Sequence, residues 1–255
     1  MTEAQENARH LRGRVAVVTG GAHGIGLAIC HRLAAEQAHL LIADIDPKIG
    51  GTVDELAQGY AVECEGYEGD LSTKACAEEM IQKAISRWGH VDIVINNAGG
   101  GVIRPFLQHT PQTLKTTIDR NLWTTIWSCW AVLPHMVERN YGRVINIGAD
   151  SVRTGLFDHA AYNAAKGGVH AMTTGLAREF ARYNITINTV APSAVDTPGL
   201  QNFNPKEIDR FISVIPKGRP AKMEEVADLV CFLSLEKTAF ITGQVISING
   251  GSAML

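Results

Sequence analysis

Two side chains that could move a proton lie close together in the stretch INIGADSVRTGLFDHAAYNAAKGG, residues 145–168. Tyr162 and Lys166 are four residues apart, so in a helix they share one face. An unperturbed tyrosine has a pKa of about 10 and is a poor base near neutral pH. A lysine ammonium on the same face is expected to stabilise the phenolate and lower that pKa. The pair is therefore predicted to take the proton of an alcohol while a hydride leaves for a nicotinamide. The alternative is a packed tyrosine beside a solvated lysine.

A glycine-rich loop near the start of the chain has the composition of a phosphate site. The stretch TGGAHGIG, residues 19–26, follows an apolar run and opens a helix-like stretch, with glycines at Gly20, Gly24 and Gly26. Glycine lets the backbone turn tightly and approach a pyrophosphate, and the helix N-terminus offers free N–H groups. The glycine spacing is wider than the common dinucleotide fingerprint. An ordinary strand-to-helix turn is the alternative.

An acidic residue at the end of the next apolar run indicates which dinucleotide binds. Asp44 closes HLLIAD, where a carboxylate would accept hydrogen bonds from the ribose hydroxyls of NAD and repel the extra phosphate of NADP. No arginine follows it, and His23 occupies the loop position where an arginine would favour NADP. The sequence therefore predicts NAD as the cofactor. The alternative is that Asp44 is a turn residue at a strand end.

The elements that position these residues follow a regular alternation. Seven apolar runs have the composition of strands: 14–20, 39–44, 60–70, 91–99, 142–148, 185–191 and 244–250. Helix-like stretches separate most of them, and the runs lack polar alternation, which predicts a doubly wound parallel α/β sheet with helices on both faces. Pro134 is expected to kink or end its helix. One domain is expected over residues 1–255, with a polar N-terminal extension at 1–12.

Composition excludes several other classes of protein. The 255 residues are 45% hydrophobic and carry a net charge of -3 without a basic run, so no nucleic-acid partner is expected. The five cysteines show no CxxC spacing, which indicates reduced, mostly buried thiols, and no metal site is expected. The N-terminus lacks the apolar core of a signal peptide, and no apolar run is long enough for a bilayer. The expectation is a cytoplasmic protein without a membrane partner.

Several motifs occur together in the order and spacing of one family. They are TGGAHGIG, NNAGG, DRNLW, YNAAK, TINTVAPSAVDTP and ITGQVISINGG. On these motifs the chain, from about Gly13 to Gly251, resembles the short-chain dehydrogenases/reductases of the Tyr-x-x-x-Lys type. The resemblance implies an NAD-dependent oxidoreductase with a single Rossmann-like domain. It also implies a homotetramer, for which the apolar C-terminal stretch ITGQVISINGGSAML is the candidate interface.

The resemblance further implies roles for individual residues. Tyr162 is the expected base, Lys166 also binds the nicotinamide ribose, and Asn121 holds a water in the proton relay. Asn97 is expected to brace the central strand. Cofactor contacts are expected from Gly20, His23, Gly24, Ile25, Gly26, Asp44, Asp70, Leu71, Asn97, Tyr162, Lys166, Val195 and Thr197.

The chain departs from the family pattern at two positions. The family usually has a serine thirteen residues before the tyrosine, where this chain has Ala149. The nearest hydroxyl is Ser151, beside Asp150. Either the loop bends so that Ser151 reaches the substrate oxygen, or the role of the serine is shared or lost. We take Ser151 as the candidate catalytic hydroxyl; a serine that makes a local turn bond is the alternative. Ser193 stands where the family usually has glycine.

Loop residues suggest the substrate class. Arg104 and Arg153 follow sheet strands, where ligands bind in such folds, and an arginine there could clamp a carboxylate. His159 and neighbouring apolar residues could form a wall. The stretches NNAGGGVIRPF, LWTTIWSCWAVLPHM and YNAAKGGVHAMT resemble dehydrogenases of aromatic cis-dihydrodiols, above all those with ring carboxylates such as benzoate or p-cumate. The reaction implied is oxidation of the diol with NAD to a catechol.

Three alternatives stay open at this point. A 3-oxoacyl reductase usually prefers NADPH, which Asp44 disfavours. An NAD-dependent hydroxyacyl-CoA or cyclic-alcohol dehydrogenase fits almost as well. A non-catalytic dinucleotide-binding protein is suggested by Ala149, but the intact Asn121, Tyr162 and Lys166 disfavour it, because a sensor needs no proton relay.

Overall fold

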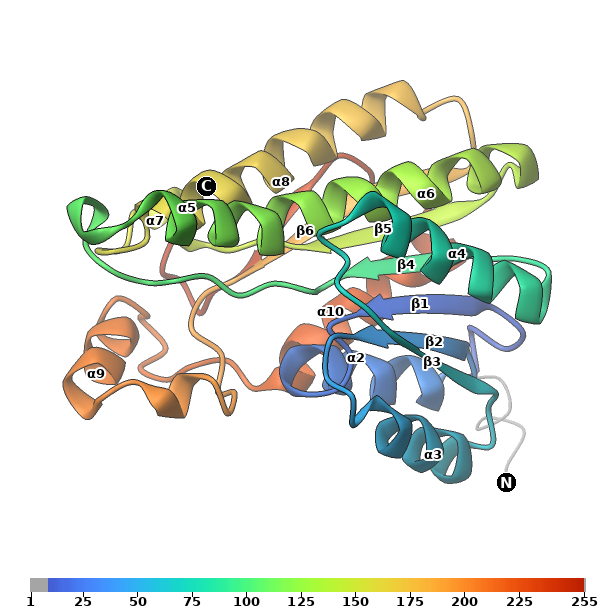
Figure 1. Ribbon diagram of the computed structural model, residues 1–255, viewed down its shortest axis with the longest axis horizontal. Helices are drawn as coiled ribbons and strands as arrows, with labels where there is room; N and C mark the ends of the chain where they lie inside the picture. Colours follow the sequence, from blue (N-terminus) through green and yellow to red (C-terminus); the bar gives the residue numbers. More distant parts are fainter. Residues whose placement is uncertain (1–8, 255) are drawn as a thin grey trace.

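Seven parallel strands form one sheet in the computed structural model of the chain, which describes residues 9–254 (Figure 1). The strands are β1 (Val15–Thr19), β2 (His39–Asp44), β3 (Cys64–Glu68), β4 (Ile93–Asn96), β5 (Gly142–Ile147), β6 (Ile185–Pro192) and β7 (Val245–Ile248). The helices with α-helical hydrogen bonding are α2 (Gly24–Ala35), α3 (Ile49–Tyr60), α4 (Lys74–Trp88), α5 (Pro111–Ile118), α6 (Thr124–Arg139), α7 (Ser151–Thr154), α8 (Ala160–Glu179), α9 (Pro205–Ser213) and α10 (Met223–Ser234). The prediction of a doubly wound parallel sheet is confirmed.

The strand order places a crevice between β1 and β4. The order is β3-β2-β1-β4-β5-β6-β7, and every neighbouring pair is parallel. The chain winds outward from β1 in one direction and from β4 in the other, so β1 and β4 flank the point where the winding reverses. In open parallel sheets, ligands bind beyond the carboxyl ends of the strands at such a point. The strand arrows in Figure 1 point toward the end of the molecule that carries α5, α7 and α9.

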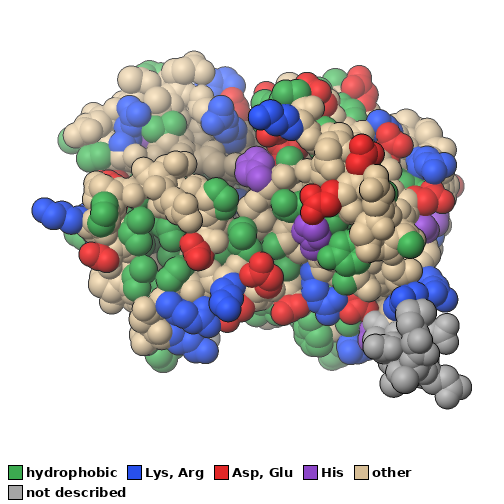
Figure 2. All heavy atoms as spheres, turned by 90° about the horizontal axis from the view of Figure 1, so that it is seen from below, with side chains coloured by type: hydrophobic (Ala, Val, Ile, Leu, Met, Phe, Trp, Pro, Cys, Tyr) green, Lys and Arg blue, Asp and Glu red, His purple; other side chains and the backbone are tan. Residues whose placement is uncertain are grey.

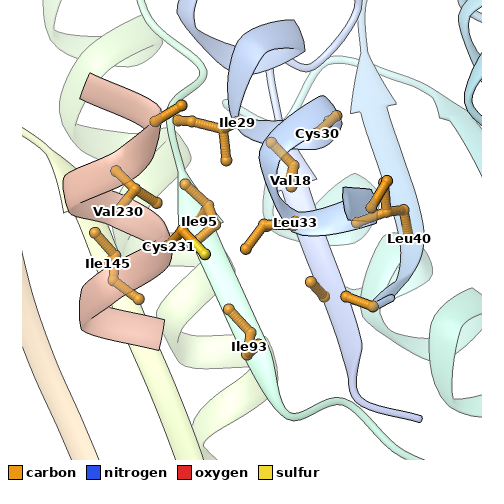
Figure 3. Packing of buried hydrophobic residues seen from close by; sticks show 14 of the residues in the cluster. Val18, Ile29, Cys30, Leu33, Leu40, Ile93, Ile95, Ile145, Val230 and Cys231 are labelled. Carbon is orange, nitrogen blue, oxygen red and sulfur yellow. The ribbon is translucent and has the colours of Figure 1, made fainter. Parts of the chain in front are cut away.

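Alternating side chains of the central strands supply two separate cores. Ala16 and Val18 of β1 pack with α2, α3 and α10 on one face, as Figure 3 shows for Val18. Val17 packs with α4, α6 and α8 on the other face. Because successive side chains of a strand point to opposite faces, both sets must be apolar. This explains why the strands read as continuous hydrophobic runs.

Two helix ends follow their local sequence signals, and a helix end expected at a third position does not occur. Gly89 ends α4 with a φ of 78°, which glycine adopts without strain, and Thr110 caps α5 with Pro111 in its first turn. Of the two effects expected of Pro134, a kink or an end of the helix, the end is excluded because α6 continues to Arg139. Because proline has no N–H, the carbonyl of Trp130, four residues earlier, lacks its helical hydrogen-bond donor. Both Trp130 and Pro134 are exposed, so water can donate to this carbonyl instead.

The N-terminal extension expected over residues 1–12 lies mostly outside the described residues, which begin at residue 9. Leu11, however, is buried in the core beside α2, and its N–H donates to the Glu36 carbonyl, so the packed part of the chain already includes it. Within residues 9–254, no helix is both long and apolar enough to cross a membrane.

Candidate active site

A cavity of about 480 Å³ lies at the carboxyl ends of the strands. It brings together six residues singled out from the sequence: Ile25, Ser151, His159, Tyr162, Val195 and Thr197. Its other walls are largely apolar and include Ile103, Leu156, Phe203, Phe211 and Val214. In Figure 2 the surface is indented between two raised parts at the upper edge of the view, and charged side chains of both signs are interspersed over this face. The start of the glycine-loop helix and the tyrosine therefore border one space.

Tyr162 and Lys166 share a face of α8, as their spacing predicts. Lys166 is buried, and its Nζ donates to the carbonyl oxygen of Ile147 at 2.7 Å and lies 5.9 Å from the centre of the Tyr162 ring. Burial raises the pKa of Tyr162 to about 12 and lowers the pKa of Lys166 to about 8. The expectation of a lowered tyrosine pKa is therefore wrong for this geometry. The ammonium is directed to the end of β5, and removal of the phenol from water dominates.

Asn121 lies in a short π-helical segment, η2 (Asp119–Trp123), between α5 and α6. Its Nδ2 donates to the carbonyl oxygens of Thr117 at 2.8 Å and Gly100 at 3.1 Å, and its Oδ1 accepts from the Gly100 N–H. A Cβ on Gly99 would lie 2.8 Å from Asn121 Oδ1 and 3.4 Å from Lys166 Nζ. The amide and the ammonium thus approach the same point of the NNAGG loop, a close approach that only glycine allows there.

The loop after β5 carries Ser151 into the cavity wall. Ser151 begins α7, and its Oγ donates to Oδ1 of Asn163 at 2.6 Å. Ala149, at the family's serine position, also lines the cavity. The structure therefore brings a hydroxyl to the same wall as Tyr162, two residues later than the family pattern, and Asn163 of the YNAAK motif holds it.

A half-buried histidine, His170, fixes this loop from behind. Nε2 of His170 accepts the N–H of Ala149 at 3.3 Å, and burial lowers the pKa of His170 to about 4. A Cβ on Gly148 would overlap His170 Nε2 and lie 2.6 Å from Cγ2 of Thr189. Since Lys166 holds Ile147 one turn earlier, α8 anchors the end of β5 at two points.

Asp150 connects the same loop to the end of the chain. Its buried carboxylate accepts hydrogen bonds from the hydroxyls of Ser247, at 2.9 Å, and Ser252, at 2.6 Å. Ser252 itself lines the cavity. The residues that follow β7 are thereby fastened against the active-site loop.

The glycine loop packs against the end of β4. A Cβ on Gly26 would overlap the carbonyl oxygen of Gly20 and lie 2.6 Å from Nδ2 of Asn97. That Nδ2 donates to the carbonyl oxygens of Thr19, at 3.0 Å, and Gly20, at 2.9 Å. Asn97 thus braces the crevice between β1 and β4, and glycine is required where the loop and α2 touch.

The N-terminus of α2 suits the pyrophosphate of a dinucleotide. His23 at the N-cap makes no side-chain hydrogen bond to the first turn, and Gly24 has a φ of 59°. The first N–H groups of the helix therefore keep their partial positive charge for an anion. Asp44 is buried at the end of β2 and accepts the Ala22 N–H at 2.9 Å, while Nδ1 of the exposed His23 lies 4.0 Å away. A carboxylate thus stands beside the loop.

The remaining cofactor candidates lie on loops at the same end of the sheet. Asp70 is exposed after β3, where its Oδ1 accepts the Ser72 N–H at 3.0 Å, and Leu71 is buried in the core. Val195 forms an isolated bridge to Ala221 after β6. Thr197 follows, with its N–H bonded to the Val195 carbonyl at 2.8 Å.

The structure does not bring the two candidate substrate arginines to the cavity. Arg153 donates to the Ser247 hydroxyl at 2.7 Å and to the Val245 carbonyl at 3.0 Å, along β7. Arg104 reaches only the Gln108 carbonyl at 3.5 Å. Among the described residues, the cavity lining contains neither arginine nor lysine. Because both arginines follow strands, the sequence predicted that they lie at the end of the sheet that carries the cavity. It could not predict in which direction their side chains point.

Sequence reasoning missed two groups of residues. His170 acts through the backbone of Ala149, and one histidine on a helix carries no pattern that reveals this. The wall formed by Phe203 and α9 was also missed, although Asn204 and Glu207 form a reciprocal capping box that marks the start of that helix.

Comparison with known proteins agrees with this geometry. A family model described as enoyl-(acyl carrier protein) reductase matches residues 20–253. The chain is 55% identical over 259 residues, all of both chains, to 2,3-dihydroxy-2,3-dihydro-p-cumate dehydrogenase of Pseudomonas putida. It is 32% identical, over 93% of this chain and 95% of the other, to 1,6-dihydroxycyclohexa-2,4-diene-1-carboxylate dehydrogenase of Acinetobacter baylyi. It is 31% identical, over 94% and 98%, to a 3-oxoacyl-(acyl-carrier-protein) reductase of Thermotoga maritima.

Proposed function

The chain belongs to the short-chain dehydrogenase/reductase family, a family of oxidoreductases, and we propose that it oxidises a cis-dihydrodiol of an aromatic carboxylate to a catechol with NAD. The observation that carries the substrate class is the 55% identity to a dihydrodiol dehydrogenase over the whole of both chains. The cavity supports it, because Tyr162 and Ser151 border a space whose walls are otherwise largely apolar and suit a six-membered ring.

A nicotinamide dinucleotide fits the described residues. The contact between Gly26 and Gly20 leaves no room for a side chain where the loop approaches the pyrophosphate, and the first turn of α2 has no side-chain cap. Ile25 reaches the cavity that Tyr162 lines, so the loop and the proton-transfer residues serve one site. NAD is proposed over NADP because the Asp44 carboxylate, beside the loop, would repel a ribose phosphate.

The proposed chemistry divides between cofactor and protein. A nicotinamide held by the glycine loop would supply the acceptor for the hydride of one carbinol carbon. Tyr162 takes the proton from the hydroxyl on that carbon, and Ser151, held by Asn163, positions the oxygen. The resulting hydroxydienone becomes a catechol by tautomerisation, in which the hydrogen on the neighbouring carbinol carbon leaves as a proton and the ketone oxygen gains a proton. The charge of Lys166, 5.9 Å from the tyrosine ring, would offset part of the cost of forming the phenolate in this buried site.

The carboxylate requires a donor other than the arginines. Ser193 lines the cavity where the family usually has glycine, and its hydroxyl has no hydrogen-bond partner among the described residues. We propose that this hydroxyl donates a hydrogen bond to the ring carboxylate, because an ionised carboxylate only accepts and a serine hydroxyl can donate.

We also propose a cytoplasmic homotetramer. β7 is an edge strand of the sheet and its residues are only half-buried, which supports the C-terminal stretch as an interface. Light scattering on a sizing column tests the assembly, and a monomer would contradict it.

A substrate panel tests the proposed reaction. NADH formation is followed with NAD and with cis-dihydrodiols that carry or lack a ring carboxylate, beside cyclic and acyl alcohols. The proposal predicts the highest kcat/KM for a carboxylated dihydrodiol. Turnover of only alicyclic or acyl alcohols would refute the substrate class, and NADH binding without any turnover would indicate a binding protein.

A further inference from the structure

His159 stands at the boundary between the catalytic helix and the wall of the cavity. It is the N-cap residue of α8, three positions before Tyr162, and it lines the cavity. Its ring contacts two others edge to face, that of Tyr162 at 6.0 Å between centres and that of Phe211 at 5.9 Å. The imidazole is thus held beside the tyrosine by aromatic contacts on two sides.

A backbone contact fixes the tautomer of this histidine. Nδ1 lies 2.7 Å from the carbonyl oxygen of Phe157. A carbonyl oxygen only accepts, so Nδ1 carries the hydrogen, and in the neutral ring Nε2 is left with a lone pair. Nε2 has no hydrogen-bond partner among the described residues. The cavity therefore contains an oriented acceptor that the proton transfer does not use.

A vicinal diol presents the matching donor. When Tyr162 takes the proton of one hydroxyl, the second hydroxyl stays protonated on the adjacent carbon. Two neighbouring groups already have other partners: Ser151 donates to Asn163 and is assigned to the first oxygen in the proposed reaction, and the Asp150 carboxylate accepts from two serines. His159, whose ring abuts that of Tyr162, is the neighbouring side chain with a free lone pair.

We propose that His159 is a specificity-determining residue that accepts a hydrogen bond from the second hydroxyl of the substrate, so that the enzyme prefers vicinal diols to mono-alcohols. This inference rests on the proposed dihydrodiol oxidation. A site that hydrogen-bonds a hydroxyl discriminates against an analogue without it, and one such bond is expected to give about 10-fold selectivity.

The test compares ligands with one and two hydroxyls on the same ring. The dissociation constants of 2,3-dihydroxybenzoate and 3-hydroxybenzoate are measured on the NADH complex of the wild type and of His159→Phe. Phenylalanine keeps the ring contacts and removes the acceptor. The wild type is expected to bind the diol about 10-fold more tightly, and His159→Phe to reduce this ratio to about 1.

Two further variants separate specificity from structure. His159→Gln retains an acceptor and is expected to keep part of the ratio, while Phe211→Leu is expected to weaken both ligands equally. Equal binding of both ligands by the wild type, or an unchanged ratio in His159→Phe, would overturn the inference. A different result would refute the proposed function, namely that the wild type does not turn over any dihydrodiol.

Discussion

Replacing Lys166 by methionine is predicted to stabilise the protein while it abolishes turnover. Burial lowers the pKa of Lys166 from its ordinary value of 10.5 to about 8. At pH 7 the charged ammonium therefore costs the folded state about 3 kcal/mol, at 1.36 kcal/mol for each pKa unit. Its hydrogen bond to the Ile147 carbonyl returns about 1 kcal/mol. Lys166→Met should accordingly raise the free energy of unfolding by about 2 kcal/mol, or the Tm by about 4–8 °C.

The lowered pKa of Lys166 also predicts how the free energy of unfolding changes with pH. Between pH 8 and 10.5 the unfolded chain binds a proton at Lys166 that the folded protein has released, so the free energy of unfolding of the wild type rises with pH in this window. Below pH 8 the full free-energy cost of the buried Lys166 ammonium is present, and above pH 10.5 this cost is absent. The gain from Lys166→Met should therefore be largest at neutral pH and shrink as the pH passes 8.

Thermal unfolding of the wild type and Lys166→Met, at pH 7 and at alkaline pH, measures both effects. Lys48→Met is the matched control, because Lys48 is exposed and its replacement should change the free energy of unfolding by less than about 0.5 kcal/mol. A Lys166→Met variant that melts below the wild type at both pH values would refute the reasoning, since the buried ammonium would then be stabilising.

Three further substitutions test the cofactor and substrate sites. Gly26→Ala should weaken NADH binding about 10- to 100-fold in a fluorescence titration, because its Cβ overlaps the Gly20 carbonyl and displaces the phosphate-binding N–H groups. Gly51→Ala, with open space around its Cβ, should leave it unchanged. Asp44→Asn should lower the ratio of kcat/KM with NAD to that with NADP about 10-fold, and an unchanged ratio would remove Asp44 from cofactor selection. Ser193→Gly should raise the KM of a carboxylated dihydrodiol about 10-fold but not that of an uncarboxylated one; equal effects would exclude the proposed carboxylate contact.

The fold and the tight packing of the glycine loop could be predicted because both follow from the local sequence. Buried strands require apolar side chains on both faces, and the runs around Val17 and Ile42 show this without any tertiary information. Gly20 and Gly26 likewise indicate that two backbone segments approach each other closely. Such features depend on residue type and order alone.

What could not be predicted depends on side-chain direction and burial. Arg153 follows a strand at the correct end of the sheet, but its guanidinium turns toward β7. The spacing of Tyr162 and Lys166 gave their shared face and not their pKa values, because desolvation exceeds their mutual attraction. The contact of His170 with the Ala149 N–H exists only once α8 packs on β6, beside the end of β5.

The most direct test of the central claim is the initial rate of NADH formation from a carboxylated cis-dihydrodiol, measured for the wild type and for Tyr162→Phe. Phenylalanine keeps the ring that contacts His159 and removes only the hydroxyl that takes the proton. General-base catalysis of this kind contributes about 100- to 10,000-fold, so kcat should fall by that factor. A Tyr162→Phe variant with the wild-type rate would contradict the account.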